Sequence, residues 1–212
     1  MSLRLRKQSR QRAEILETSV ELFRDRGIGA VRIADIVARC EISEATFFNY
    51  FGNKDMLLGE WASDLLDAEL EHVAREMEQG GTLRRELRAG LKNLAIQVQS
   101  DQPLHKAAWS RLRAAHPDPV LMAARGRSNR RDPALALVLL SQEQGECRAD
   151  LPGEQLAGLL RTALIATMVS GLEHSELDRR GFLELRLVRA CDLILDGFRK
   201  RNERTKPSAA PA

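Results

Sequence analysis

The amino-acid sequence predicts an all-α fold, and three observations carry the prediction. No stretch alternates apolar and polar residues with the period of two that is typical of half-buried strands. Strong helix formers, chiefly Ala, Leu, Glu and Arg, dominate the composition. Apolar residues recur at helical spacing from one end of the chain to the other, with breaks at Gly, Pro and Asn. We expect about nine helices, over residues 11–26, 33–39, 44–50, 54–79, 82–100, 103–115, 133–144, 153–176 and 182–201.

Local signals mark the first four helices. One face of the first helix is marked by residues at i, i+3, i+4 and i+7 spacing, which are Leu16, Ser19, Val20 and Phe23. Gly27 is a natural stop after it. The second helix has on one face Ile33, Ile36 and Val37. Ser43 can cap the third helix and Asn53 the fourth, because a side-chain oxygen at that position accepts a backbone N–H of the first turn.

Breaks in the pattern separate the later helices. Gly80 and Gly81 precede the fifth helix, and two prolines at residues 116–119 end the sixth. Pro133 stands at the first position of the next helix, where proline is tolerated. We expect residues 125–132 to form a mobile loop and residues 205–212 to be a disordered tail.

Composition excludes several classes of protein. The basic N-terminus is not followed by the apolar stretch of a secretory signal. The most apolar run, residues 156–172, contains Arg161 and is too short to span a bilayer. We therefore expect a cytoplasmic protein with no membrane partner, associated with the nucleoid when it is bound to DNA. Three cysteines and four histidines show no metal-binding spacing, so no metal or cofactor is expected.

Charge and aromatic residues are unevenly distributed along the chain. The net charge is +3, but residues 1–12 hold five basic residues and no acid, so the other 200 residues carry −2. Five of the nine aromatic residues fall within the first 51 positions. These asymmetries predict a small aromatic module, preceded by a basic arm, and a longer aliphatic domain.

The short helices 33–39 and 44–50, with the three-residue turn between them, have the layout of a helix-turn-helix. At helical spacing Phe47 and Phe51 share one face of the second helix, and Ala45 and Asn49 lie on the opposite face. A helix with small and polar residues outward can enter a DNA major groove. By this geometry alone an ordinary amphipathic helix is the better interpretation.

A family resemblance favours the DNA-binding interpretation. The first 60 residues resemble the DNA-binding domain of the tetracycline-repressor (TetR) family, most specifically through S-x-x-T-F-F-x-Y-F-x-x-K at residues 43–54. Residues 145–173 are similar to the family's penultimate helix and its approach. The resemblance implies a ligand-responsive transcriptional repressor that binds a (pseudo)palindromic operator in double-stranded DNA as a dimer. It also implies a DNA-binding domain with its basic arm over residues 1–53 and an effector-binding and dimerisation domain over residues 54–204.

The resemblance assigns roles to individual residues. Thr46 and Tyr50 correspond to hydroxyls that bind DNA phosphates, and Lys54 lies at a helix N-terminus that favours an anion. The basic arm would follow the DNA backbone or enter the minor groove. Base-edge contacts are expected from Arg32, Ser43, Glu44, Ala45 and Asn49. The full set of DNA-contact candidates is Arg32, Ser43, Glu44, Ala45, Thr46, Phe48, Asn49, Tyr50 and Lys54.

Three positions depart from the family's usual pattern. Phe48 replaces a tyrosine, which removes one phosphate-binding hydroxyl. Glu41 stands in the turn where glycine is usual, so either its φ is positive or the turn has another shape. Val31 and Arg32 stand where the second helix usually opens with threonine. These departures leave the fold intact and the operator sequence open.

The penultimate expected helix is apolar on nearly all sides and must be covered on more than one side, and the last expected helix also carries apolar residues at helical spacing. The resemblance implies that they pair with the same helices of a second copy, and burial within one subunit is the alternative. It also places an unknown small-molecule effector among the middle helices. Candidate ligand contacts, for each of which core packing is the alternative, are Trp61, Leu65, His105, Trp109, Leu112, Met122 and Met168.

Two other classes of function compete with a regulator. An enzyme would need a site made of scattered residues, because the sequence shows no nucleophile–base pair, metal cluster or glycine-rich phosphate loop. A helical sensor or partner-binding protein without operator binding would leave the basic arm unexplained. We therefore expect a DNA-binding regulator and not an enzyme.

Overall fold

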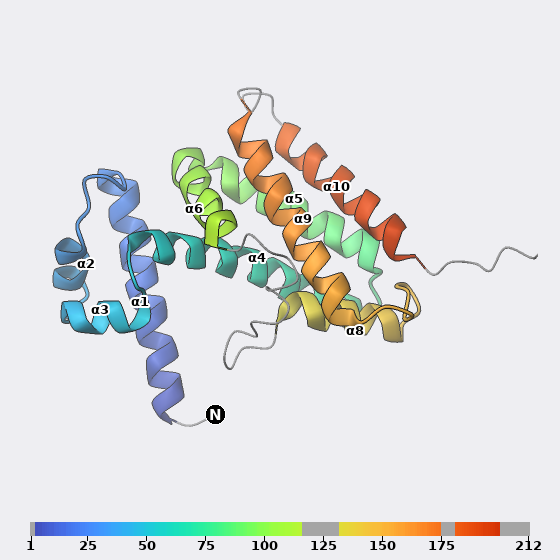
Figure 1. Ribbon diagram of the computed structural model, residues 1–212, viewed down its shortest axis with the longest axis horizontal. Helices are drawn as coiled ribbons and strands as arrows, with labels where there is room; N and C mark the ends of the chain where they lie inside the picture. Colours follow the sequence, from blue (N-terminus) through green and yellow to red (C-terminus); the bar gives the residue numbers. More distant parts are fainter. Residues whose placement is uncertain (1–2, 116–131, 175–180, 200–212) are drawn as a thin grey trace, which may run out of the picture.

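The computed structural model describes residues 3–115, 132–174 and 181–199 (Figure 1). These residues form nine α-helices and no strand, which confirms the predicted all-α class. The helices are α1 (Leu3–Arg26), α2 (Ile33–Arg39), α3 (Glu44–Tyr50), α4 (Lys54–Glu78), α5 (Leu83–Gln99), α6 (Gln102–Ala115), α8 (Pro133–Glu143), α9 (Gly153–Glu173) and α10 (Phe182–Phe198). The expected break at 116–119, the tail at 205–212 and all but the last residue of the expected loop at 125–132 lie outside the described residues, and that last residue, Asp132, is the N-cap of α8.

Figure 1 shows two regions, a head of α1–α3 and a larger body of α4–α10. The head differs from the expectation at its start, since α1 begins at Leu3 and not at residue 11. Residues 3–10 contain no glycine or proline, so nothing stops the helix from extending toward the N-terminus. The expected basic arm is therefore the exposed first turns of a long helix, from which most of its cations project into solvent.

The predicted helix starts at Ser43 and Asn53 are confirmed. The Ser43 hydroxyl accepts the Thr46 N–H at 3.1 Å, and the Asn53 side chain accepts the Met56 N–H at 2.8 Å. Each bond satisfies a backbone donor that the first turn of a helix leaves unpaired. The two caps fix where α3 and α4 begin, and therefore which side chains α3 exposes.

Aromatic side chains fill the core of the head. Phe23 from α1 is buried together with Phe47 and Phe51, whose ring centroids lie 5.9 Å apart. Ile15 and Ile36, from α1 and α2, are fully buried in the same core. Burying one such ring stabilises the fold by roughly 2–3 kcal/mol, so a few aromatics are enough to hold the two short helices against α1.

Helix α4 leaves the head and continues through the body, where it packs against α5, α6 and α8 (Figure 1). Its contact with α6 is close at Gly59, where an added Cβ would lie 3.4 Å from the backbone nitrogen of Leu112. Helix α4 is thus the element common to the head and the body.

Helix α9 is long and apolar enough to cross a membrane by length and composition, but most of it is buried against neighbouring helices of the body. Its one buried cation, Arg161, is only 8% exposed. The guanidinium lies 2.6 Å from Asp67 of α4 and 2.8 Å from Asp132, the residue before α8. Because a buried charge is tolerated only when it is paired, these contacts fix α9 against α4 and α8.

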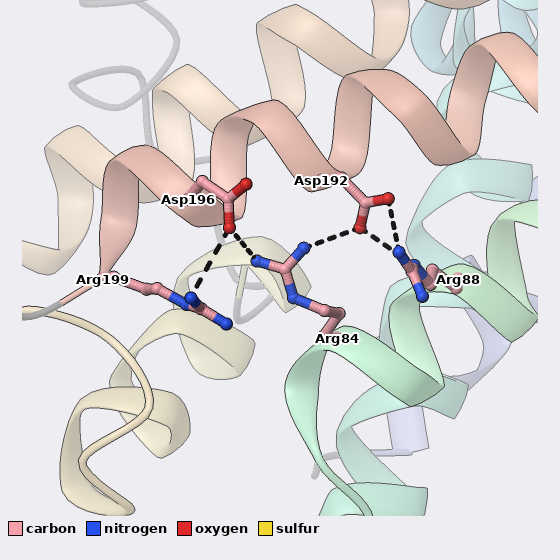
Figure 2. A network of polar contacts seen from close by, with 5 residues as sticks. All are labelled: Arg84, Arg88, Asp192, Asp196 and Arg199. Carbon is pink, nitrogen blue, oxygen red and sulfur yellow. Dashed lines mark hydrogen bonds and ion pairs between the residues drawn. The ribbon is translucent and has the colours of Figure 1, made fainter.

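Polar side chains hold α10 against α5 (Figure 2). Arg84 donates to Asp192 at 2.8 Å and to Asp196 at 2.5 Å, and Arg88 donates to both oxygens of Asp192. Arg199 reaches Asp196 at 3.9 Å. The hydrogen bonds from Arg88 hold the pKa of Asp192 below its ordinary value. This network joins helices more than 100 positions apart in the sequence.

Candidate DNA-binding surface and ligand-binding region

The turn between α2 and α3 contains a left-handed residue. Glu41 has φ 53°, and it is the one non-glycine residue with positive φ in the described ranges. The turn closes through the Ile42 N–H, which donates to the Val37 carbonyl at 3.0 Å. The first of the two alternatives at Glu41, a positive φ without glycine, is therefore the correct one. Such a conformation costs about 1–2 kcal/mol, which the other contacts of the head offset.

Helix α3 separates its residues by face as the helical spacing predicts. Phe47 is fully buried in the head. Glu44, Ala45, Phe48 and Asn49 form the exposed face of α3. The ring of Phe48 is 48% exposed and meets the ring of Phe47 edge-on, with centroids 5.7 Å apart. The structure therefore presents on one face of α3 four of the candidate DNA contacts, three of which are predicted base-edge contacts.

The candidate phosphate contacts on α3 already make hydrogen bonds within the head. The hydroxyls of Ser43 and Thr46 lie 2.9 Å apart. Tyr50 donates its hydroxyl to the side-chain oxygen of Gln11 at 3.0 Å, which ties α3 to α1. A hydroxyl that donates one bond still has lone pairs but no second proton. Tyr50 must therefore break its hydrogen bond to Gln11 before its hydroxyl can donate to a phosphate oxygen.

Lys54 has a structural role that the sequence did not reveal. Its ammonium donates to the carbonyls of Ile28 at 3.0 Å and Val31 at 2.5 Å. Both carbonyls lie in the segment between α1 and α2, so the lysine holds that segment against the start of α4. These oxygens explain a cation at a helix N-terminus without any phosphate. One of the three ammonium N–H groups is left for a further acceptor.

Arg32 lies at the N-cap position of α2. Its backbone N–H donates to Asp35 at 2.7 Å, while its side chain is 82% exposed. Its guanidinium lies 3.7 Å from Asp35, and because this ion pair is exposed and weak, the side chain can turn toward a neighbouring phosphate or base edge. Arg32 and the exposed face of α3 are therefore the most accessible of the predicted contacts.

Arg12 is the exception among the five N-terminal basic residues. It is half-buried and forms ion pairs with Glu60 and Asp64 of α4, the latter at 2.9 Å. Its guanidinium carbon also lies 5.3 Å from the ring centroid of Phe51. This residue fastens α1 to α4, so it is a structural contact and not part of a free arm.

The candidate ligand contacts fall inside the body. Trp61 stacks on His105, with centroids 4.7 Å apart and planes 27° apart. Trp109, Leu112 and Met168 are buried, and Leu65 is half-buried. Met122 lies outside the described residues. The structure thus brings at least Trp61 and His105 into contact, from α4 and α6.

Two polar atoms in this region are buried and have no hydrogen-bond partner in the described part of the chain. They are Nδ1 of His105 and Nε1 of Trp109, one helical turn apart on α6. Burial lowers the pKa of His105 to about 4, so its ring is neutral near pH 7. An unsatisfied buried polar atom costs about 1–3 kcal/mol, so these two positions are suited to a bound polar group.

A contact that the sequence did not predict joins the head to this region. Arg24, in the last turn of α1, lies 3.4 Å from Asp101 at the start of α6. Its guanidinium carbon lies 5.8 Å from the ring centroid of Trp61. The four residues Arg24, Trp61, Asp101 and His105 are called the junction below. No local sequence pattern marks it, because its members come from three helices.

The described residues contain no group of three or more His, Cys, Asp or Glu side chains that could hold a metal ion.

Known proteins resemble the head most clearly. Residues 15–60 match the family described as "Bacterial regulatory proteins, tetR family". The chain is 43% identical over 65 residues to the HTH-type transcriptional repressor Rv3405c of Mycobacterium tuberculosis, covering 31% of this chain and 30% of that protein. It is 36% identical over 67 residues to the HTH-type transcriptional regulator LuxR of Vibrio harveyi, covering 32% and 29%. The match spans less than a third of these curated relatives.

Solved structures resemble nearly the whole chain. The FadR repressor of Thermus thermophilus, a TetR-family protein in complex with lauroyl-CoA, has a TM-score of 0.67 and 26% identity, covering 94% of this chain and 100% of that one. A TetR-family regulator of Pectobacterium atrosepticum has a TM-score of 0.55 and 18% identity, covering 91% and 95%. The second likeness, at this identity, is one of fold.

Proposed function

We propose that this chain is a TetR-family, ligand-responsive transcriptional repressor that binds a (pseudo)palindromic operator as a homodimer. The observation that carries the proposal is the exposed face of α3. Glu44, Ala45, Phe48 and Asn49 stand outward on a helix-turn-helix. The opposite face of α3 is held by the buried ring of Phe47. A rigid helix with an accessible face is what reading a major groove requires.

The remaining contacts surround that face. Thr46, Tyr50 and Lys54 bind phosphates, and Arg32 and Ser43 approach base edges from the N-terminal ends of α2 and α3. The exposed basic residues at the start of α1 add sequence-independent attraction to the DNA backbone. They are Arg4, Arg6, Lys7 and Arg10.

Selection from a pool of random DNA duplexes with the full-length chain tests this function. We expect enrichment of an inverted repeat whose half-sites are one helical turn apart, because two linked heads must meet the same face of the duplex. Specific binding should exceed binding to a scrambled duplex by about 1,000-fold or more. Equal affinity for all duplexes would overturn the proposal.

Exposed apolar residues on the last two helices support the homodimer. Leu159 of α9 is exposed, and so are Leu185 and Leu193 of α10, with Leu193 at 75%. Small residues accompany them, including Ala166 and Gly197, which allow a close approach of two helices. Apolar faces of this kind on two adjacent helices are typical of an interface between copies.

The effector is proposed to bind between α4, α6 and α9, beside Trp61, Leu65, His105, Trp109, Leu112 and Met168. These side chains are mostly apolar, and the indole N–H of Trp109 has no acceptor in the described residues. A largely aliphatic ligand with one polar acceptor meets both conditions. Because the similar Thermus thermophilus repressor is bound to lauroyl-CoA, acyl-CoA thioesters are the first class to assay.

Thermal unfolding with lauroyl-CoA, and with coenzyme A as the control, tests this ligand class. A ligand that binds only the folded protein raises Tm, and the stabilisation grows with the logarithm of its concentration over Kd. We expect a rise with the thioester and a smaller one with coenzyme A. Equal shifts would mean that the acyl chain is not recognised.

Helix α4 and the junction provide a path between ligand and DNA. Trp61 lies on α4, which begins at Lys54, and Arg24 joins α1 to both Trp61 and Asp101. A ligand beside Trp61 would change operator affinity only if it binds one arrangement of the heads better than the other. Linkage then requires that operator DNA change ligand affinity by the same factor.

A further inference from the structure

Phe48 differs from every other aromatic residue of the chain. All nine aromatic side chains lie in the described residues, and only Phe48 is exposed. It stands on the outer face of α3 with Ala45 three positions before it and Asn49 beside it. Its ring rests edge-on against the buried ring of Phe47. The phenyl group is therefore accessible and is supported by the core of the head.

The chemistry of a phenyl ring limits what Phe48 can contact on DNA. It has no hydroxyl, so it cannot donate a hydrogen bond to a phosphate as a tyrosine would. Among the groups that base pairs present in the major groove, the C5 methyl of thymine is the apolar one. Ala45 adds no bulk that would keep the ring away from a base edge.

We propose that Phe48 recognises a thymine in each operator half-site through the C5 methyl group. The inference rests on the proposed DNA binding and adds a determinant of sequence preference to it. Because packing against Phe47 orients the ring, little side-chain entropy is lost when the methyl group is bound. The contact removes one methyl group from water in each half-site.

The expected size of the effect follows from that burial. Removing one methyl-sized apolar group from water is worth about 0.8 kcal/mol, which corresponds to about a fourfold change in affinity. A palindromic operator contains the contact twice, so the change for the whole site is about 15-fold. An effect of this size is easily resolved by fluorescence anisotropy.

The test replaces thymines of the selected operator with deoxyuridine, one symmetric pair at a time. Deoxyuridine lacks only the C5 methyl group, so pairing with adenine is retained. Wild-type chain should lose about 15-fold in affinity at one pair of thymines. Phe48→Tyr, which keeps the ring, should show the same loss, and Phe48→Ala should show none. Asn49→Ala serves as the matched control and should keep the thymine dependence.

The outcomes separate this inference from the function on which it rests. If the chain selects no DNA sequence, the proposed operator binding fails and the inference with it. If an operator is found but every uracil duplex binds as well as the parent, only the Phe48 inference fails. It also fails if the half-sites contain no thymine, or if Phe48→Ala retains the full uracil effect.

Discussion

The head and the body of this protein are stabilised in different ways. In the head, a few aromatic rings such as Phe47 and Phe51 form the core, and nearby caps and backbone bonds set the helix ends. In the body, long aliphatic helices are fixed by ion pairs between distant residues, such as Arg161 with Asp67. The helix ends and the turn of the head are therefore set largely by neighbouring residues, whereas the packing of the body depends on contacts between segments far apart in the sequence.

This difference suits two different tasks. Operator DNA has a fixed shape, so the helix that contacts its bases must be rigid. The positions of its exposed side chains must also be well defined. A small-molecule site can vary as long as the surrounding helices stay packed. The following predictions break one region at a time, from the largest expected effect to the smallest.

The dimer interface of the body should have the largest effect on DNA binding. Leu193→Glu places a charge at the proposed interface, so we expect a monomer with normal helicity. Separating the two heads should lower operator affinity by about 100-fold or more, because the second half-site no longer binds from the same molecule. Sedimentation and anisotropy measure the two effects. Ile96→Glu, on the exposed side of α5, is the matched control and should remain a dimer.

Substitution of two adjacent phenylalanines, Phe47 and Phe48, should have different effects on stability, because one lies in the interior of the head and the other on its surface. Phe47→Ala should lower the free energy of unfolding by about 3–5 kcal/mol, because it empties the centre of the aromatic core. Phe48→Ala should change it by no more than about 0.5 kcal/mol, since the ring is exposed. Urea denaturation measures both. Similar losses for the two variants would mean that the faces of α3 are assigned the wrong way round.

Lys54 and Arg32 distinguish a structural cation from an exposed one. Lys54→Ala removes two bonds to backbone carbonyls and should destabilise the protein by about 1–3 kcal/mol. If the ammonium also contacts a phosphate, the substitution should reduce the slope of log affinity against log salt concentration by about one unit. Arg32→Ala should leave stability unchanged and affect DNA binding alone. An unchanged salt slope for Lys54→Ala would remove this lysine from the DNA contacts.

His105 predicts a pH dependence that originates in the body. Its pKa is about 4 in the folded protein, below the ordinary value of 6.5, because burial disfavours the charged ring. The unfolded chain therefore binds a proton first as the pH falls. Stability present above pH 6.5 should decline toward pH 4, by about 1–2 kcal/mol at about pH 5. Denaturation of His105→Gln should show a smaller decline over this range, and an equal decline would contradict the prediction.

The junction should give the smallest energetic effect. Arg24 and Asp101 are partly exposed, so their ion pair is worth only about 0.2–1 kcal/mol. A double-mutant cycle with Arg24→Gln and Asp101→Asn should give a coupling free energy in this range. No measurable coupling would mean that α1 and α6 communicate only through α4.

The sequence predicted the head in more detail than the body. Ser43 and Asn53 lie where the caps were expected, and the positive φ of Glu41 was one of two stated alternatives. Caps, turns and helix faces depend on neighbours in the sequence, so local patterns are sufficient to predict them. The pattern predicts a start for α1 that is eight residues too late, because a run of basic residues is typical of an arm although each of them is also a good helix former.

The contacts that the sequence missed all join distant segments. Lys54 holds the loop after α1, Arg12 reaches α4, and Arg24 reaches α6. In each case the partner lies more than 20 positions away, and no spacing rule relates the two. The assignments of DNA and ligand contacts remain predictions, since they depend on molecules that bind from outside.

The affinity of the full-length chain for its selected operator, with the number of chains bound per duplex, tests the central claim most directly. We predict two chains per duplex and a loss of about 1,000-fold or more when both half-sites are scrambled at constant composition. Scrambling one half-site should give an intermediate loss, because one head can still bind specifically. Binding that is equally tight to the operator and the scrambled duplex would contradict the account.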